Sequence, residues 1–275
     1  MVVLAFLTLL SAPPAPGKLV DAGGYRVHLY CTGQGNPTVM IVGAGFSFDW
    51  GLVQPEASKF TRVCTYDPAG MAWSDPAPSA PTCSQKVKEI HTLVKNAGIP
   101  GPHVLVGLSL GAVVARLYAS QYPREVAGMV IVDHAFLNPN TSEPAVEPQT
   151  PIVVNLEDDP NYARLPERNR EMRRWAVSLN PARPTLESAE ACVAEADAAA
   201  GKFPSNLPLF VVSTASDSPN YLRLQTELLA LSSQSRQLIA EKSYHPVHID
   251  QPEVIVDAIQ EVVAAVRKHS GAKRN

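Results

Sequence analysis

The chain has 275 residues, a formal net charge of −3, and 18% charged residues of both signs. A chain of this length can bury a full core, and it suits one large domain better than two equal ones. Because the charges are scattered, no basic face is available for nucleic acid. We therefore expect a small-molecule substrate and no nucleic-acid partner; nothing in these numbers sets an oligomeric state.

The chain begins with "MVVLAFLTLLSAPPAPGK", a short apolar run followed by a stretch rich in Pro and Ala. This pattern is similar to the core and exit of a secretory signal, although no Lys or Arg precedes it. The run is too short for a membrane-spanning helix. We expect residues 1–17 to be a signal or leader of a secreted or cell-envelope protein; a buried strand or anchor in a cytoplasmic protein is the alternative. The even number of cysteines permits disulfides and also fits buried thiols: Cys31, Cys64, Cys83 and Cys192.

From about residue 25 onward, apolar runs typical of strands alternate with helical patterns. "YRVHLYCT", "PTVMIVGAG" and "FTRVCTYD" predict strands, and residues 84–97 predict a helix. "HVLVGL" and "VAGMVIVD" predict two buried strands around a helix over 110–121. After residue 206, "LPLFVVSTASD", "YLRLQTELLAL", "SRQLIAEKS" and "PEVIVDAIQEVVAAVRKH" predict a strand, a helix, a short strand and a final helix.

The alternation is interrupted between residues 137 and 206, where a proline-rich stretch precedes two predicted helices with no strand between them. This segment is predicted to be an insertion rather than another strand-helix unit. The fold class is therefore α/β, with a mostly parallel central sheet, helices on both faces, and a single domain over 18–275 that carries the insertion.

Gly107-Leu108-Ser109-Leu110-Gly111 fits the pattern G-x-S-x-G and lies between a buried strand and a helix. In that setting the tight turn lifts the serine hydroxyl above the sheet, whereas the bare pattern is common in ordinary turns. A neutral serine is a poor nucleophile, so it needs an imidazole to take its proton and a carboxylate to orient that imidazole. We expect Ser109 to be a nucleophile.

Candidate partners for Ser109 follow the later strands. Asp217 comes just after the strand "LFVV", and His245 lies in the loop after the last predicted strand. Asp133, at the end of "GMVIVD", is the alternative acid, and His248 is the alternative base. Asp67 and Asp75 are explained by turn-forming roles, and the remaining histidines by structural or solvated positions.

The segments "VGLSLGA", "TYDPAGMAWSD", "VAGMVIVD", "VVSTASD" and "SYHPVHIDQPEVIVDAI" together resemble the α/β-hydrolase fold family. The resemblance covers nearly the whole chain from about Lys18 and implies a nucleophile at Ser109, an acid at Asp217 and a base at His245. It also implies that the insertion at about 137–206 is a short helical lid. Two departures are Tyr244-His245, where the family has Gly-His, and Ala44-Gly45, where it often has His-Gly.

The resemblance implies an oxyanion hole formed by the backbone N–H groups of Phe46 and Leu110. Residues predicted to line the substrate pocket are Gly45, Phe48, Trp73, His134 and Trp175. Four arginines of the insertion, at 168, 170, 173 and 174, form either a solvated helix face or a cationic cluster at the pocket mouth.

The function predicted from these residues is cleavage of a carboxylic ester through an acyl-enzyme on Ser109, with no cofactor and no metal. Thioester, lactone, amide or C–C bond hydrolysis by the same residues is an alternative. A ligand-binding relative without catalysis is the alternative from a different class.

Overall fold

The computed structural model describes residues 11–43, 45–135, 162–181, 184–215 and 218–272, with side chains through His269. The predicted leader lies mostly outside these ranges, as does the first part of the insertion.

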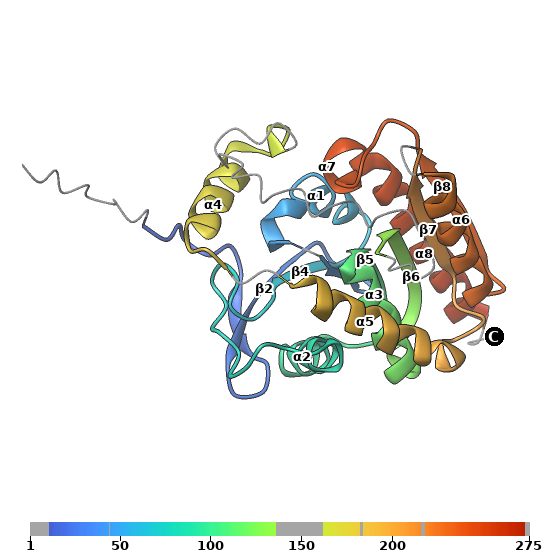
Figure 1. Cartoon of the computed structure of the whole chain (residues 1–275), viewed down its shortest axis with the longest axis horizontal. Helices are drawn as coiled ribbons and strands as arrows, with labels where there is room; N and C mark the ends of the chain where they lie inside the picture. Colours follow the sequence, from blue (N-terminus) through green and yellow to red (C-terminus); the bar gives the residue numbers. More distant parts are fainter. Residues whose placement is uncertain (1–10, 44, 136–161, 182–183, 216–217, 273–275) are drawn as a thin grey trace, which may run out of the picture.

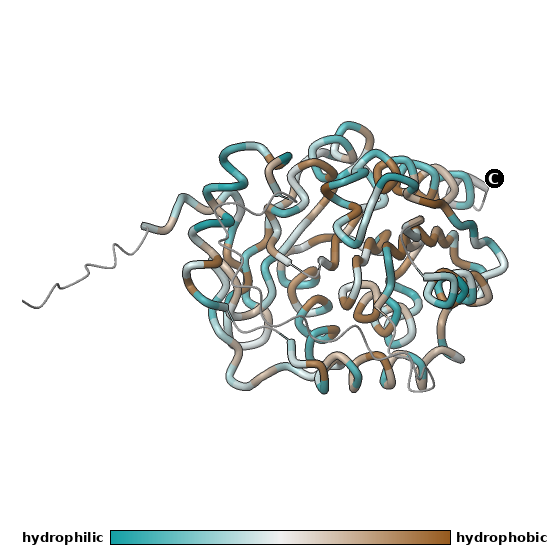
Figure 2. The backbone as a smooth tube through the Cα atoms, turned by 45° about the horizontal axis from the view of Figure 1, so that its top comes forward, coloured by the Kyte–Doolittle hydropathy of each residue, from teal (hydrophilic) through white to brown (hydrophobic). Residues whose placement is uncertain are grey.

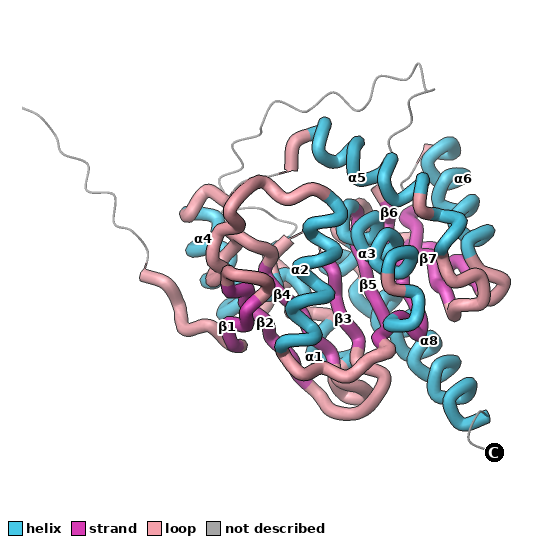
Figure 3. The backbone as a smooth tube through the Cα atoms, turned by 90° about the horizontal axis from the view of Figure 1, so that it is seen from below, coloured by secondary structure: helices cyan, strands magenta, loops and turns pink. Residues whose placement is uncertain are grey.

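An eight-stranded sheet forms the centre of the molecule, in the order β1-β2-β4-β3-β5-β6-β7-β8 (Figures 1 and 3). Only the β1–β2 and β2–β4 pairs are antiparallel. The five remaining pairs are parallel, so the predicted mostly parallel sheet is confirmed. The strands are β1 (Lys18–Asp21), β2 (Arg26–Thr32), β3 (Val39–Val42), β4 (Val63–Asp67), β5 (His103–Ser109), β6 (Val126–His134), β7 (Leu209–Thr214) and β8 (Ser235–Ala240).

Helices cover both faces of the sheet. The α-helices are α1 (Gln54–Ala57), α2 (Cys83–Asn96), α3 (Leu110–Gln121), α4 (Glu167–Ser178), α5 (Leu186–Ala198), α6 (Pro219–Glu227), α7 (Val247–Asp250) and α8 (Pro252–Ala272). Short 3-10 helices are η1 (Ser47–Trp50), η2 (Pro123–Glu125), η4 (Ala200–Lys202) and η5 (Leu228–Leu231). Apolar side chains of α2, α3 and α5 belong to the core on one face, and those of α1 and α8 to the core on the other.

The strands divide their side chains between two cores because successive residues point to opposite faces. On β3, Met40 and Val42 join the core under α2 and α3, whereas Val39 and Ile41 join the core under α8. All four are at most 1% exposed. This explains the continuous apolar runs in the sequence, and Figure 2 shows the hydrophobic stretches running through the middle of the molecule.

The described part of the insertion contains the two predicted helices, α4 and α5. Helix α5 packs against α3, and α4 packs against η1 (Figure 1). A disulfide between Cys83 and Cys192 joins α2 to α5, and a second disulfide, Cys31–Cys64, joins β2 to β4. The insertion is thereby covalently fixed to the body of the sheet.

Candidate active site

Ser109 ends β5 and immediately precedes α3, and its φ of 54° is in the left-handed region. The two glycines of the motif permit this turn. A Cβ at Gly107 would lie 2.5 Å from the Cα of Ala112, and one at Gly111 would overlap the backbone oxygen of Val42. Strand and helix therefore approach more closely than any other residue type allows, and the serine is placed at the carboxyl edge of the parallel strands.

Asp133 lies at the same edge, on the neighbouring strand β6. Leu108 pairs with Val132 and Ser109 pairs with His134, so Asp133 is an extra residue in the ladder. Its φ of 40° is also in the left-handed region. Such an irregularity can reorient a side chain at a strand end.

The Asp133 carboxylate contacts His245, which lies in the loop between β8 and α7. Nδ1 of His245 is 2.5 Å from Oδ2 of Asp133. Asp133 is 2% exposed, whereas the His245 side chain is 58% exposed. A buried carboxylate therefore fixes one ring nitrogen of an accessible imidazole. Asp217, the acid favoured by the sequence, lies outside the described residues.

The alternative base, His248, has a different environment. It is 5% exposed and lies against Trp50, with a ring separation of 5.1 Å. Burial lowers the pKa of His248 to about 3, with further contributions from the neighbouring His245 and Arg173. Such an imidazole stays neutral but is too weak a base to take a serine proton near neutral pH. The exposure of His245 and its contact with Asp133 therefore favour His245 over His248 as the candidate base.

His134, predicted to line the pocket, is fully buried. Its Nε2 lies 2.9 Å from Nη1 of Arg116 on α3. Burial, reinforced by the Arg116 charge, holds the pKa of His134 well below its usual value. The His134 imidazole therefore lies in the core against Arg116 of α3 and not in solvent.

Two backbone N–H groups were predicted to form the oxyanion hole. Leu110 begins α3, where the first N–H groups have no partner within the helix. The N–H of Phe46 donates to Oδ2 of Asp49 at 3.1 Å. Asp49 is 2% exposed, and both of its carboxylate oxygens lie 2.8 Å from Nη1 of Arg173 on α4. The Phe46 donor is thus already engaged by a buried carboxylate, and the close fit extends to Gly45, where a Cβ would lie 2.6 Å from the same oxygen.

The structure brings three of the predicted pocket residues together with Phe46. Phe48 stacks on Phe46 with ring centroids 5.0 Å apart, and Trp73 lies 5.8 Å from Phe48 and 4.9 Å from Trp175. These rings form a cluster with Met172 and Ala176 of α4. This largely buried apolar cluster joins the loop that carries Phe46 to α4.

The four arginines of the insertion have separate roles. Arg170 and Arg174 pair with Glu167 on the same helix, and Arg168 is exposed, as expected for a solvated face. Arg173 instead points inward to Asp49, with a side chain that is 14% exposed. In the part of the chain that the structure describes, three of the four charges are therefore paired with a carboxylate, and only that of Arg173 is paired with a buried one.

The structure gives Asp67 a different role from the one predicted, and it adds Gln225, which the sequence does not single out. Asp67 is fully buried rather than in a turn, 2.7 Å from Nδ1 of His28, and it accepts the Ser47 N–H at 2.6 Å. Gln225 on α6 donates to Oδ1 of Asp133 at 3.1 Å. The sequence offered no signal for Gln225, because a glutamine on an amphipathic helix resembles a solvated residue.

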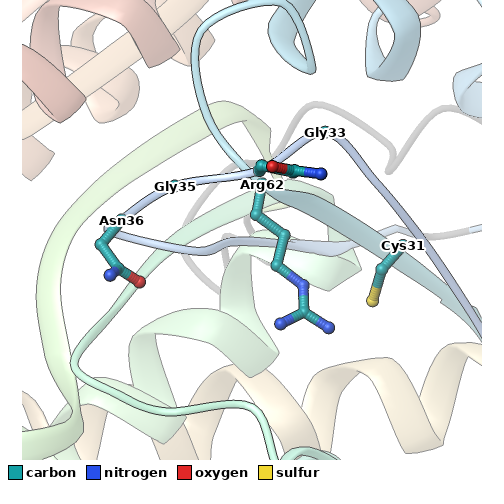
Figure 4. Close-up of a pocket in the computed structure, with 6 residues that line it drawn as sticks. Cys31, Gly33, Gly35, Asn36 and Arg62 are labelled. Atoms are coloured by element: carbon teal, nitrogen blue, oxygen red, sulfur yellow. The ribbon is translucent and has the colours of Figure 1, made fainter.

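A separate hollow of about 360 Å³ lies where β2 ends and β4 begins (Figure 4). It is lined by Cys31, Gly33, Gln34, Gly35, Asn36 and Arg62. Because β4 begins here and runs parallel to β3 and β5, this is the edge of the sheet opposite Ser109. The hollow contains none of the candidate catalytic residues.

Comparison with known proteins identifies the family. Residues 38–258 match the family described as the alpha/beta hydrolase family. The chain is 26% identical over 222 residues to the uncharacterized protein YqjL of Bacillus subtilis, covering 78% of each chain. It is 32% identical over 127 residues to a 2-hydroxymuconate semialdehyde hydrolase of a Pseudomonas strain, covering 44% of each chain.

A structure of a putative lipase from Acinetobacter baumannii superimposes with a TM-score of 0.71 at 17% identity, covering 92% of each chain. That likeness shows the fold. Within the described residues, no helix is both long enough and apolar enough to cross a membrane. With the sheet order, the strained serine turn and the family match over most of its length, this chain belongs to the alpha/beta hydrolase family.

Proposed function

We propose that the protein is a serine hydrolase that cleaves carboxylic esters through an acyl-enzyme on Ser109. The observation that carries the proposal is the 2.5 Å contact between His245 and Asp133 beside the strand whose end holds Ser109. The acid in this proposal is Asp133, the alternative rather than the residue that the sequence favoured. The aromatic cluster around Phe46 supports a substrate with an apolar acyl group.

Each residue has a defined role in this reaction. With Nδ1 of His245 held by Asp133, Nε2 is the nitrogen that takes the Ser109 proton as the oxygen attacks the carbonyl carbon. The same imidazolium returns the proton to the leaving alcohol. Water then attacks the acyl-enzyme with His245 again as the base, and the acid product leaves. The N–H of Leu110 and that of Phe46, which Asp49 shares, stabilise the tetrahedral oxyanion.

The test is labelling by a fluorophosphonate probe of the wild type beside Ser109→Ala, His245→Ala, Asp133→Asn and Asp217→Asn. We expect no labelling of Ser109→Ala and a rate about 10³ to 10⁴ lower for Asp133→Asn. Asp217→Asn is the matched control and should label as the wild type does. Folded wild type that does not label would overturn the proposal; normal labelling of Asp133→Asn with loss in Asp217→Asn would move the acid to Asp217.

C–C bond hydrolysis is the second candidate, favoured by the 32% identity to a 2-hydroxymuconate semialdehyde hydrolase. The same serine, histidine and aspartate would serve. Parallel assays with p-nitrophenyl esters, thioesters, lactones and 2-hydroxymuconate semialdehyde separate these reactions by product.

We further propose that the insertion acts as a lid over this site and that the protein is exported. Two features support the proposal. Helix α4 packs against η1, which directly follows Phe46, and both described disulfides require an oxidising compartment. Mass spectrometry of the mature protein from its native host tests export: loss of about the first 15 residues is expected, and an intact N-terminus with reduced cysteines would contradict it.

A further inference from the structure

Gln225 is a fully buried amide on α6 whose hydrogen bonds all go to the dipeptide Asp133-His134. Nε2 donates to Oδ1 of Asp133 at 3.1 Å and to the carbonyl oxygen of His134 at 3.2 Å. Oε1 accepts the N–H of His134 at 3.3 Å. Gln225 is 0% exposed, so one buried side chain bonds a carboxylate oxygen, a carbonyl oxygen and an N–H group at the end of β6.

The partners fix which way the amide points. Nε2 faces two acceptors, the Asp133 carboxylate and a carbonyl, whereas Oε1 faces an N–H donor. The reversed amide would place its oxygen against two oxygens and its NH₂ against an N–H. A hydrogen of Gln225 is therefore aimed at Oδ1 of Asp133.

Asp133 needs this donor because its carboxylate is almost completely buried. Oδ2 contacts His245, and Oδ1 accepts from Gln225. Rotation of the carboxylate would weaken both contacts together. A buried carboxylate oxygen without a donor is costly, so loss of the Gln225 amide favours a reoriented Asp133.

Helix α6 also supports the irregular backbone at this point. Tyr221, one turn before Gln225, donates its hydroxyl to the carbonyl of His134 at 2.5 Å. Asp133 has a positive φ directly before that carbonyl. Two side chains from the same face of α6 thus hold the strand end that carries the proposed acid.

We propose that Gln225 is a positioning residue of the active site, which holds the Asp133 carboxylate so that Oδ2 faces Nδ1 of His245. This inference rests on the proposed function, in which Asp133 orients His245 and stabilises the imidazolium. Gln225 itself contacts neither Ser109 nor the imidazole in any described hydrogen bond. Its effect on the reaction passes through Asp133.

The test is the rate of fluorophosphonate labelling of Gln225→Leu as a function of pH. A misaligned Asp133 stabilises the imidazolium less, so His245 loses its proton at lower pH. We expect the acid limb of the profile to move down by at least about 0.3 pH unit and the plateau rate to fall about tenfold. With an ester substrate, the fall should be in kcat rather than KM.

Gln54→Leu is the matched control. Gln54 is another buried glutamine, 4% exposed, which donates to the carbonyls of Tyr30 and Val63 at 3.2 and 3.4 Å. Its loss should lower the melting temperature comparably and leave the pH profile unchanged. Gln225→Glu is a second variant of nearly the same shape. Its added negative charge beside Asp133 favours the imidazolium, so the acid limb should move to higher pH.

Opposite shifts in the two variants, or the expected shift in whichever variant folds, support the proposal. An acid limb within about 0.2 pH unit of wild type in every folded Gln225 variant overturns it, and so does a shift of equal size in Gln54→Leu. All these comparisons use a wild type that labels at Ser109. If the folded wild type does not label, the result contradicts the proposed function and not the role of Gln225.

Discussion

The backbone N–H of Phe46 donates to the buried carboxylate of Asp49, which is held in turn by Arg173 from α4. An N–H group that donates to a carboxylate is a weaker donor to a second negative oxygen nearby. Asp49 therefore links the loop that carries Phe46 to α4, and its negative charge competes with the oxyanion that the proposed reaction would develop.

Asp49→Asn should accelerate fluorophosphonate labelling about threefold. The amide oxygen of the asparagine can still accept the hydrogen bond from Phe46. The substitution, however, removes a negative charge from beside the developing oxyanion and leaves the positive charge of Arg173 without the Asp49 carboxylate. Asp75→Asn, which breaks the surface pair between Asp75 and Arg26, is the control and should not change the rate. Slower labelling of folded Asp49→Asn would show that the carboxylate supports the loop instead of competing with it.

The disulfide Cys83–Cys192 should contribute more to stability than Cys31–Cys64. The first pair is separated by 109 residues and the second by 33. A disulfide lowers the conformational entropy of the unfolded chain, and more so for a longer loop. We therefore expect the double variant Cys83→Ser with Cys192→Ser to lose about 5 kcal/mol of unfolding free energy, and the variant without the other disulfide to lose about 1 kcal/mol less. Urea unfolding of the two double variants measures the difference. Equal losses would mean that contacts between α2 and α5 persist in the unfolded chain.

His248 should make the protein less stable in acid. Its pKa in the folded protein, about 3, lies below its ordinary value of 6.5. As the pH falls below 6.5 the unfolded chain takes up the proton first, so stability is present above that pH and is lost toward pH 3. Between pH 6.5 and 4.5 we expect the free energy of unfolding to fall by about 2 kcal/mol because of His248.

His248→Phe should not show that part of the loss, because phenylalanine fills the space beside Trp50 without titrating. Urea unfolding at several pH values compares this variant with wild type and with His269→Gln, a change at an exposed position of α8. Parallel pH dependence in wild type and His248→Phe would contradict the assignment.

The centre of the sheet could be predicted from the sequence because strands such as β3, β4 and β7 are buried on both faces and form continuous apolar runs. The run "PTVMIVGAG" predicts β3, and the helix expected over 110–121 is α3. The short elements β1, α1 and α7 were missed. Each has only four residues, too few for a periodic pattern, and each depends on contacts with distant segments.

The site was predictable where a local motif sets it. Ser109 follows from the glycines that surround it. The contact between Asp133 and His245 depends on an extra residue in the β6 ladder, which looks in the sequence like the ordinary end of an apolar strand. Gln225 and Arg173 reach the site only through the packing of α6 and α4, so their side chains resemble solvated helix residues until the tertiary structure is known.

The irregular pairing at Asp133 also restricts which insertions and deletions β6 can accept. Removing one residue of β6 before Asp133 would move His134 into the place of Asp133. An imidazole would then lie against His245. Adding one residue would move Asp133 into the place of His134, which contacts Arg116. A loop can change length by a residue without changing what lies at either end, but a strand cannot. The proposed acid on β6 therefore ties the proposed chemistry to a fixed number of residues in that strand, so changes of chain length should be tolerated in the loops before they are tolerated within β6.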